Sequence, residues 1–243
     1  MKTSEYIEDK INKLPKGYVF TYIDFMNEVA KREAVIKHLN RMATSGKIYK
    51  LSKGKYYKPQ ETVFGTLLPD QNQIVKDLLE EDGKLVGYIT GYSVYNSLGL
   101  TTQVSNTIQI GKREIRPSFK RGRFRISFIK QKNTINKENI PLLQLLDAMR
   151  YVKKIPDSNI AKSCIRFMVL LRELNSSEQR KIIKLAFKYS PATRALLGAL
   201  LREIDCKAET EIRDLQDTLN PITVYNLGIS EKVLSNAKYW NIK

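Results

Sequence analysis

The chain has 243 residues, of which 42% are hydrophobic, and it carries a formal net charge of +17 at pH 7. This length can bury real hydrophobic cores and suits two or three small domains. The chain shows neither a signal-peptide pattern nor an apolar stretch long enough to span a membrane, so the sequence predicts a cytoplasmic protein without membrane contact.

Residues 1–60 predict a winged helix-turn-helix. Residues 4–14 have the pattern of an amphipathic helix, and residues 18–20 can form a short strand. Thr21 and Asp24 are spaced as a capping box for a helix over residues 25–30. A second helix is predicted over residues 31–45. Two basic strands around the turn Ser52-Lys53-Gly54 then predict a hairpin that forms the wing.

The second predicted helix has an apolar side and a polar side. Val35, Leu39 and Met42 recur at spacings of four and three, which places them on one face toward a core. The opposite face and the hairpin carry the residues expected to contact DNA. On the helix these are Lys31, Arg32, Lys37, Asn40, Arg41 and Thr44; on the wing they are Lys53, Lys55 and Tyr56. A winged helix that acts as a protein-interaction module has the same pattern and stays an alternative.

The positive charge of the chain is concentrated in two segments. Residues 31–58 contain nine Lys or Arg against the single Glu33, and residues 112–132 contain nine against the single Glu114. The two segments therefore carry sixteen of the seventeen net positive charges. Such focused charge is typical of a surface that binds a polyanion.

Residues 61–135 predict an α/β region. A helix is expected over residues 72–81, and the glycines that follow lack the spacing of a phosphate-binding loop, so turns and close packing explain them better. Alternating apolar residues at 108–110 and 124–128 predict a half-buried antiparallel hairpin. Its arginines Arg121, Arg123 and Arg125 are predicted as secondary DNA contacts, or alternatively protect a sheet edge from aggregation.

Residues 136–243 predict a helical region. Helices are expected to start near Pro141, after Ser176 and after Ser190. The last of these carries Leu196, Leu197, Leu200 and Leu201, which predicts either the centre of a helical bundle or a docking surface. The expected fold class is therefore α+β, with a winged helix, a middle α/β region and a C-terminal helical region.

The residue inventory argues against catalysis. The only histidine, His38, lies in the second predicted helix, where packing or a phosphate contact is expected of it. The two cysteines, Cys164 and Cys206, lie in apolar helical patterns and are expected to be reduced core thiols. The sequence thus predicts a protein that is not an enzyme, with no metal and no cofactor.

Short motifs spread along the chain resemble one known family. They are the basic hairpin at residues 53–59, the sequence Gly-Tyr-Ile-Thr-Gly at residues 87–91, Leu-Gly-Leu-Thr-Thr-Gln at residues 98–103, Leu-Gly-Ile at residues 227–229 and Trp-Asn-Ile at residues 240–242. In this order they resemble the AbiEi family of antitoxins from type IV, AbiE-like toxin-antitoxin systems.

The resemblance implies a bacterial antitoxin that represses its own operon. In such proteins an N-terminal winged helix binds inverted repeats in the promoter, and the C-terminal part counteracts a nucleotidyltransferase-like toxin, with or without a stable complex. The systems serve in phage defence. Two alternatives stay open: a transcription regulator without a toxin, and a module that binds RNA or protein through the same basic face.

Overall fold

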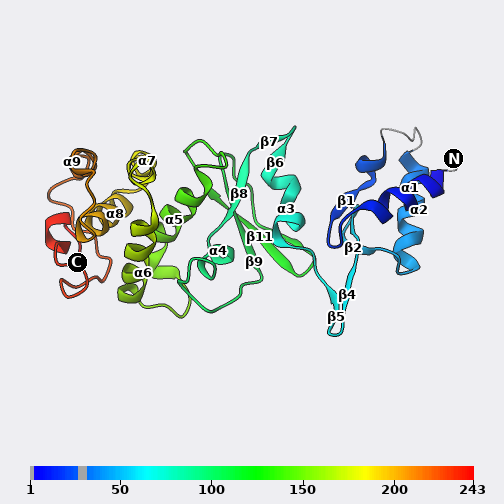
Figure 1. Cartoon of the computed structure of the whole chain (residues 1–243), viewed down its shortest axis with the longest axis horizontal. Helices are drawn as coiled ribbons and strands as arrows, with labels where there is room; N and C mark the ends of the chain where they lie inside the picture. The colour runs from blue at the N-terminus through cyan, green and yellow to red at the C-terminus, as the bar shows by residue number, and fades with distance from the viewer. Residues whose placement is uncertain (1–2, 27–31) are drawn as a thin grey trace. The chain divides into compact units, whose positions relative to one another are not determined.

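The computed structural model describes residues 3–26 and 32–243, which form two compact units (Figure 1). The first unit comprises the chain up to Leu79 together with Lys120–Phe124, and the second comprises Glu80–Phe119 and Arg125–Lys243. Both α-helices and β-strands are present, as the expected α+β class requires. Three domains with boundaries near residues 60 and 135 were predicted, and the chain instead folds as these two units.

The first unit begins with a helix, a strand, a helical turn, a second helix and a hairpin. These elements are α1 (Thr3–Lys13), β1 (Val19–Thr21), η1 (Tyr22–Phe25), α2 (Arg32–Thr44), β2 (Tyr49–Ser52) and β3 (Lys55–Tyr57). The strands form an antiparallel sheet in the order β1-β3-β2, because β3 pairs with β1 on one side and β2 on the other. Apart from η1, each of these elements lies within a residue or two of its predicted position.

The predicted capping box is present. The Ile23 N–H donates to Thr21 Oγ1 at 3.2 Å, and the Thr21 N–H donates to Asp24 Oδ2 at 2.7 Å. The box starts the short 3-10 helix η1, where an α-helix was predicted. Residues 27–31, which include the rest of that predicted helix and Lys31, lie outside the described residues.

A hydrophobic core holds the first unit together. It buries apolar side chains from α1, β1, η1, α2 and the hairpin, and each contributes roughly 1.5–3 kcal/mol by leaving water. The core consists of Ile7, Ile11, Phe20, Phe25, Val35, Leu39, Met42, Ile48 and Tyr56.

The first unit continues beyond residue 60. A second hairpin, β4 (Gln60–Thr62) and β5 (Gly65–Leu67), is followed by α3 (Gln71–Leu79). The Val19 N–H donates to Gln73 Oε1 at 3.2 Å, and Ile74 on the same helix is fully buried. This packing of α3 is the reason why the predicted boundary at residue 60 is wrong.

The sheet of the second unit differs from the predicted hairpin. Its strands are β8 (Gly87–Thr90), β9 (Thr107–Lys112), β10 (Phe119–Arg121) and β11 (Phe124–Lys130), in the order β10-β11-β9-β8. β8 pairs antiparallel with β9, but β11 pairs parallel with β9, from Arg125 opposite Thr107 to Lys130 opposite Lys112. The chain returns through β10 before it enters β11, so β11 runs in the same direction as β9. The predicted antiparallel pairing of these two strands is therefore wrong.

Helices complete the second unit. After the short hairpin β6 (Glu80–Glu81) and β7 (Lys84–Leu85) and the helix α4 (Tyr92–Tyr95), the unit contains α5 (Ile140–Arg150), η2 (Val152–Lys154), α6 (Ile160–Glu173), α7 (Ser176–Ala186), α8 (Pro191–Glu203), α9 (Glu209–Asp217) and η3 (Ala237–Trp240). The cap of α7 is Asn175, one residue before the predicted Ser176, and it forms a capping box with Glu178.

One hydrophobic core joins the sheet and the helices of the second unit, which explains why the predicted boundary near residue 135 is not found. Tyr88 and Leu100 belong to the same cluster of buried residues as Phe167 on α6. Leu196, Leu197, Leu200 and Leu201 are fully buried in this core, so α8 is the centre of the helical packing and the docking-surface alternative is wrong. The predicted core thiols Cys164 and Cys206 are buried and unpaired in disulfides.

A buried carboxyl group lies between the sheet and the helices. Asp147 on α5 is 1% exposed. It accepts hydrogen bonds from the Tyr88 hydroxyl at 2.6 Å, the Thr90 hydroxyl at 2.9 Å and the Tyr189 hydroxyl at 2.9 Å. Burial raises the pKa of Asp147, while the three hydroxyl donors oppose that shift. The network therefore ties β8 and the loop between α7 and α8 to α5.

A candidate nucleic-acid interface on the first unit

The apolar stripe of α2 orients the rest of the helix. Val35 and Leu39 are fully buried and Met42 is 5% exposed, so the opposite side of the helix is turned to solvent. There, Lys37, Asn40, Arg41 and Thr44 are all exposed, as predicted. Together with Glu33, Ile36 and Ser45 they line a shallow, open hollow of about 700 Å³. The structure thus brings four of the predicted contacts into one surface, which we call the α2 outer face.

A buried tyrosine fixes the position of the Asn40 side chain. Its Oδ1 accepts a hydrogen bond of 2.7 Å from the Tyr56 hydroxyl. This bond uses the oxygen of the amide, so the NH₂ group remains as the donor. Tyr56 itself is 3% exposed and its ring stacks on Phe20 with centroids 6.4 Å apart. The prediction that Tyr56 contacts DNA is therefore wrong, because the side chain is buried and orients Asn40.

Arg41 is oriented in a similar way by His38. Arg41 Nη2 lies 3.2 Å from His38 Nδ1, and His38 Nε2 lies 3.5 Å from Glu8 Oε1 on α1. Burial lowers the pKa of His38; Glu8 opposes this shift, and the charges of Arg41 and Lys47 add to it. The imidazole is thus mostly neutral at pH 7, and its Nδ1 can accept a hydrogen bond from the Arg41 guanidinium. Of the two roles predicted for His38, the structure supports packing.

The other predicted contact residues of the first unit differ in the interactions that their charged groups form. The Arg32 guanidinium lies 4.7 Å from the centre of the Tyr22 ring, which holds it at the start of α2. Lys53 is exposed at the turn between β2 and β3, where Gly54 adopts a φ of 75°. Lys55 is only partly exposed, and its Nζ lies 3.1 Å from Asp77 Oδ2 on α3. Lys55 is therefore paired with a carboxylate of the first unit.

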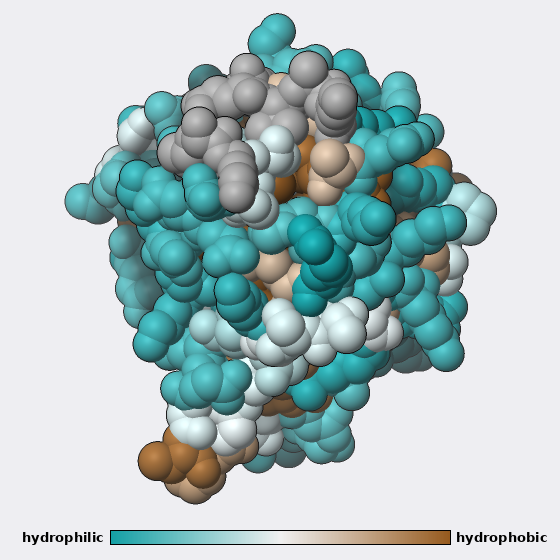
Figure 2. All heavy atoms as spheres, turned by 90° about the vertical axis from the view of Figure 1, so that its right-hand side faces the viewer, coloured by the Kyte–Doolittle hydropathy of each residue, from teal (hydrophilic) through white to brown (hydrophobic). Residues whose placement is uncertain are grey.

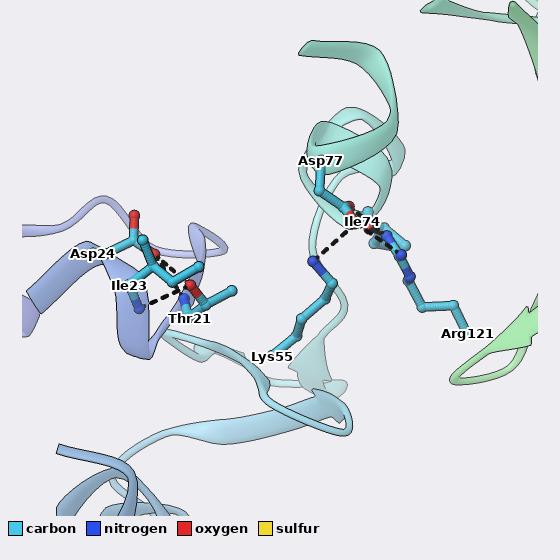
Figure 3. A network of polar contacts seen from close by, with 7 residues as sticks. All are labelled: Thr21, Ile23, Asp24, Lys55, Ile74, Asp77 and Arg121. Atoms are coloured by element: carbon cyan, nitrogen blue, oxygen red, sulfur yellow. Dashed lines mark hydrogen bonds and ion pairs between the residues drawn. The ribbon is translucent and has the colours of Figure 1, made fainter. Parts of the chain in front are cut away.

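Asp77 also binds Arg121 (Figure 3). Arg121 Nη1 lies 2.6 Å from Asp77 Oδ1 and Nη2 lies 3.0 Å from Oδ2, a bidentate pair, while Nη1 also donates to the Ile74 carbonyl at 2.7 Å. Arg121 is 6% exposed. The prediction that it contacts DNA is wrong, because its charge is buried and paired within the first unit.

Arg123 and Arg125 are exposed, as the alternation along the strand predicts. The Arg123 guanidinium lies 5.2 Å from the centre of the Phe124 ring, and Arg125 Nη2 donates to Ser118 Oγ at 3.1 Å. Neither forms an ion pair with a carboxylate in the part of the chain that the structure describes. The choice between edge protection and a secondary DNA contact stays open for these two residues.

Asp77 was not predicted, and it should stabilise the first unit in a pH-dependent way. Burial alone would raise its pKa, but the hydrogen bond from Arg121 and the charges of Arg121 and Lys55 hold the pKa below its usual value. A lowered pKa means that its stabilising effect is present above the unfolded-state pKa and is lost as the pH falls through the folded-state pKa.

We expect Asp77→Asn to lower the free energy of unfolding of the first unit by about 1–3 kcal/mol at pH 7, because it replaces the carboxylate that pairs with the buried Arg121 guanidinium by a neutral amide. Urea denaturation of the full chain measures this loss. The difference between native chain and variant should shrink as the pH is lowered from about 5 to 3. A difference that does not change with pH would contradict the assigned role of Asp77.

The carboxylates of the first unit mostly act away from the α2 outer face. Glu8 lies beside His38 and Lys47, Asp24 caps η1, Glu61 accepts from Thr66, and Asp77 holds Lys55 and Arg121. Seventeen Lys or Arg residues stand against nine Asp or Glu residues in this unit. Lys37 and Lys53 therefore extend into solvent without a carboxylate partner in the described chain, an arrangement that attracts an anion.

Neither a metal site nor a membrane-spanning helix is found in the described parts of the chain. No group of three or more His, Cys, Asp or Glu side chains there is placed to hold a metal ion. None of the helices described combines the length and the apolar character needed to cross a membrane.

The comparisons with known proteins give a family and a fold. The crystal structure of the RV2827C protein from Mycobacterium tuberculosis aligns with 91% of this chain and 83% of its own, with a TM-score of 0.56 and 11% sequence identity. At this identity the likeness shows the fold alone. No curated protein matches the chain. A family described as a family of unknown function, DUF6088, matches residues 6–178, which is more than half of the sequence. The chain therefore belongs to the DUF6088 family.

Proposed function

We propose that the first unit is a winged helix that binds duplex DNA. In this proposal α2 is the recognition helix in the major groove, and the hairpin of β2 and β3 is the wing beside the phosphate backbone. The observation that carries the proposal is the α2 outer face. It presents Lys37 and Arg41 to solvent, and it fixes the Asn40 amide through Tyr56.

The geometry suits the two kinds of contact that DNA recognition needs. Asn40 and Arg41 are short or restrained side chains that can read base edges, since Asn pairs well with adenine and Arg with guanine. Arg32, Lys37 and Lys53 are placed to neutralise phosphates, which fix the register without reading sequence. Thr44 lies on the same face, and its hydroxyl can form a hydrogen bond with a base edge or with a phosphate.

Duplex binding by this surface should depend strongly on salt. If about six phosphates are neutralised, the logarithm of the binding constant should fall against the logarithm of salt concentration with a slope of roughly −5. Fluorescence anisotropy of a labelled duplex over a series of salt concentrations gives this slope. A slope near zero would mean that the basic face does not contact the backbone.

We further propose that the protein is an antitoxin that represses its own operon and counteracts a nucleotidyltransferase-like toxin. The support is the resemblance to AbiEi antitoxins together with the exposed basic side chains of the α2 outer face on the first unit. The toxin-opposing activity is assigned to the second unit. We do not propose α8 as the surface for it, because its leucines are buried.

Growth of cells tests the antitoxin proposal. The reading frame beside this gene is expressed with and without the full chain supplied from a separate promoter, and the proposal expects growth arrest that the chain relieves. A full-length Lys37→Glu/Arg41→Glu variant should still relieve the arrest, because it changes only the DNA-binding face. Cells that grow normally without the chain, or an arrest that it does not relieve, would reject the antitoxin role and leave DNA binding as a separate question.

A further inference from the structure

The hairpin of β4 and β5 carries apolar side chains where a water-exposed hairpin normally carries polar ones. Thr62 pairs with Gly65, so Val63 and Phe64 form the turn between the strands. They are 93% and 97% exposed. Gly, Asn, Asp, Ser and Pro are the usual residues of such turns, because their backbones and side chains suit the bend and water. The hairpin projects from the first unit in Figure 1, and its tip is the brown projection at the bottom of Figure 2.

The apolar character continues along one strand only. Leu67 in β5 is 45% exposed and Leu68 after it is 38% exposed. The opposite strand, β4, carries Gln60, Glu61 and Thr62, all polar and exposed. Within the described chain the two strands pair only with each other, so the outer edge of β5 has no strand beside it. An isolated two-stranded hairpin is marginally stable in water, and a further strand would stabilise it.

The charge of the chain favours a second copy of the same chain as the partner. Residues 59–75 contain none of the 42 Lys and Arg residues. Two molecules of net charge +17 repel each other over their basic faces, and this hairpin is a place where they can meet without bringing cations together. The same composition disfavours DNA at the tip, because Glu61 would lie near phosphates and no Lys or Arg would offset it.

We propose that two copies of the chain associate through β5, antiparallel and related by a two-fold axis. A strand edge is self-complementary in this arrangement, so one β5 can supply the backbone partners of the other. Phe64, Leu67 and Leu68 of both copies would then be covered together. This association does not rest on nucleic-acid binding. It would place two α2 helices on one assembly, which is how paired half-sites are bound.

The proposal is tested by the oligomeric state of the full chain in the absence of DNA. The contact is small, so we expect a weak dimer whose fraction rises over about 5–200 μM in sedimentation-velocity experiments. Two matched variants add the same charge at cross-strand neighbours, because Gln60 pairs with Leu67. Leu67→Lys should leave a monomer at every concentration, whereas Gln60→Lys on the polar strand should keep most of the dimer.

A third variant removes the apolar tip and keeps the turn. Val63→Ser/Phe64→Asn gives Ser-Asn before Gly65, a sequence suited to a hairpin turn, so the first unit should stay folded while the dimer is weakened at least tenfold. A native chain that is monomeric throughout would overturn the proposal, as would equal association of the Leu67→Lys and Gln60→Lys variants. Duplex DNA affinity, measured on the same samples, is a separate readout: if it alone is absent, the proposed DNA binding fails and this proposal stands.

Discussion

Reversing two charges on the α2 outer face is expected to lower the affinity for duplex DNA by more than about 100-fold. The variant is Lys37→Glu/Arg41→Glu. It removes a cation that no carboxylate in the described chain pairs with and the guanidinium that His38 orients, and it places two anions where phosphates would lie. Neither side chain belongs to the buried core of the first unit, so folding should be unaffected. Anisotropy titration at fixed salt measures the loss.

A control variant separates this local effect from the change in net charge. Lys13→Glu/Lys16→Glu alters the charge of the first unit by the same amount, at exposed positions at the end of α1 and after it. It should weaken duplex binding only several-fold, through long-range electrostatics. Similar losses in both variants would mean that α2 has no special role in the binding.

Removing the buried carboxylate of the second unit is expected to have the largest effect on stability. Asp147→Ala should lower the free energy of unfolding by about 3–5 kcal/mol, because it removes the acceptor that three buried hydroxyl groups share and opens a cavity. The hydroxyls belong to Tyr88, Thr90 and Tyr189. Tyr189 keeps a longer hydrogen bond of 3.4 Å to the Leu143 carbonyl, and Gln131 Nε2 still donates to both tyrosine oxygens at 2.8 Å.

The substitution Asp147→Asn tests whether the loss arises from the acceptor. The amide keeps the volume of the side chain and one acceptor oxygen, so it should recover part of the stability that alanine loses. Chemical denaturation followed by far-UV circular dichroism measures both variants. Equal stability of the native chain and Asp147→Ala would show that the network contributes nothing to the fold.

Local patterns predicted most of the elements between residues 3 and 57. The spacing of Val35, Leu39 and Met42 predicts which side of α2 is buried, and the pairing of Thr21 with Asp24 predicts where η1 starts. These signals are local, because helical periodicity and capping depend on residues only a few positions apart. The exposure of Lys37, Asn40, Arg41 and Thr44 follows from the same periodicity.

These local patterns could not predict contacts between residues that are distant in sequence. Arg121 was expected to point to solvent like Arg123, but the turn at Gly122 separates them, and Arg121 instead pairs with Asp77, 44 residues away. Tyr56 was expected to contact DNA from the hairpin, yet its side chain is buried in the core of the first unit, where it bonds to Asn40. The parallel pairing of β9 with β11 was missed for the same reason, since alternation predicts a strand but not its partner.

The two units differ in the role of their buried polar groups. In the first, buried groups such as Tyr56 and His38 hold exposed polar side chains in fixed positions, which lowers the cost of ordering them when a ligand binds. In the second, the polar network around Asp147 is buried and serves packing. The candidate interface is therefore on the first unit, and the second unit is the place to search for the proposed antitoxin activity.

The most direct test of the central claim is binding of the full native chain to duplex DNA from the region upstream of its own gene. The experiment is an anisotropy competition at one salt concentration with four competitors of the same length: duplex DNA, duplex RNA and single-stranded DNA of the same sequence, and a DNA duplex of scrambled sequence. We predict that duplex DNA competes best and that a scrambled duplex competes at least tenfold less well. Preference for RNA or single strands, or no binding at micromolar concentrations, would contradict the assignment of the first unit as a DNA-binding winged helix.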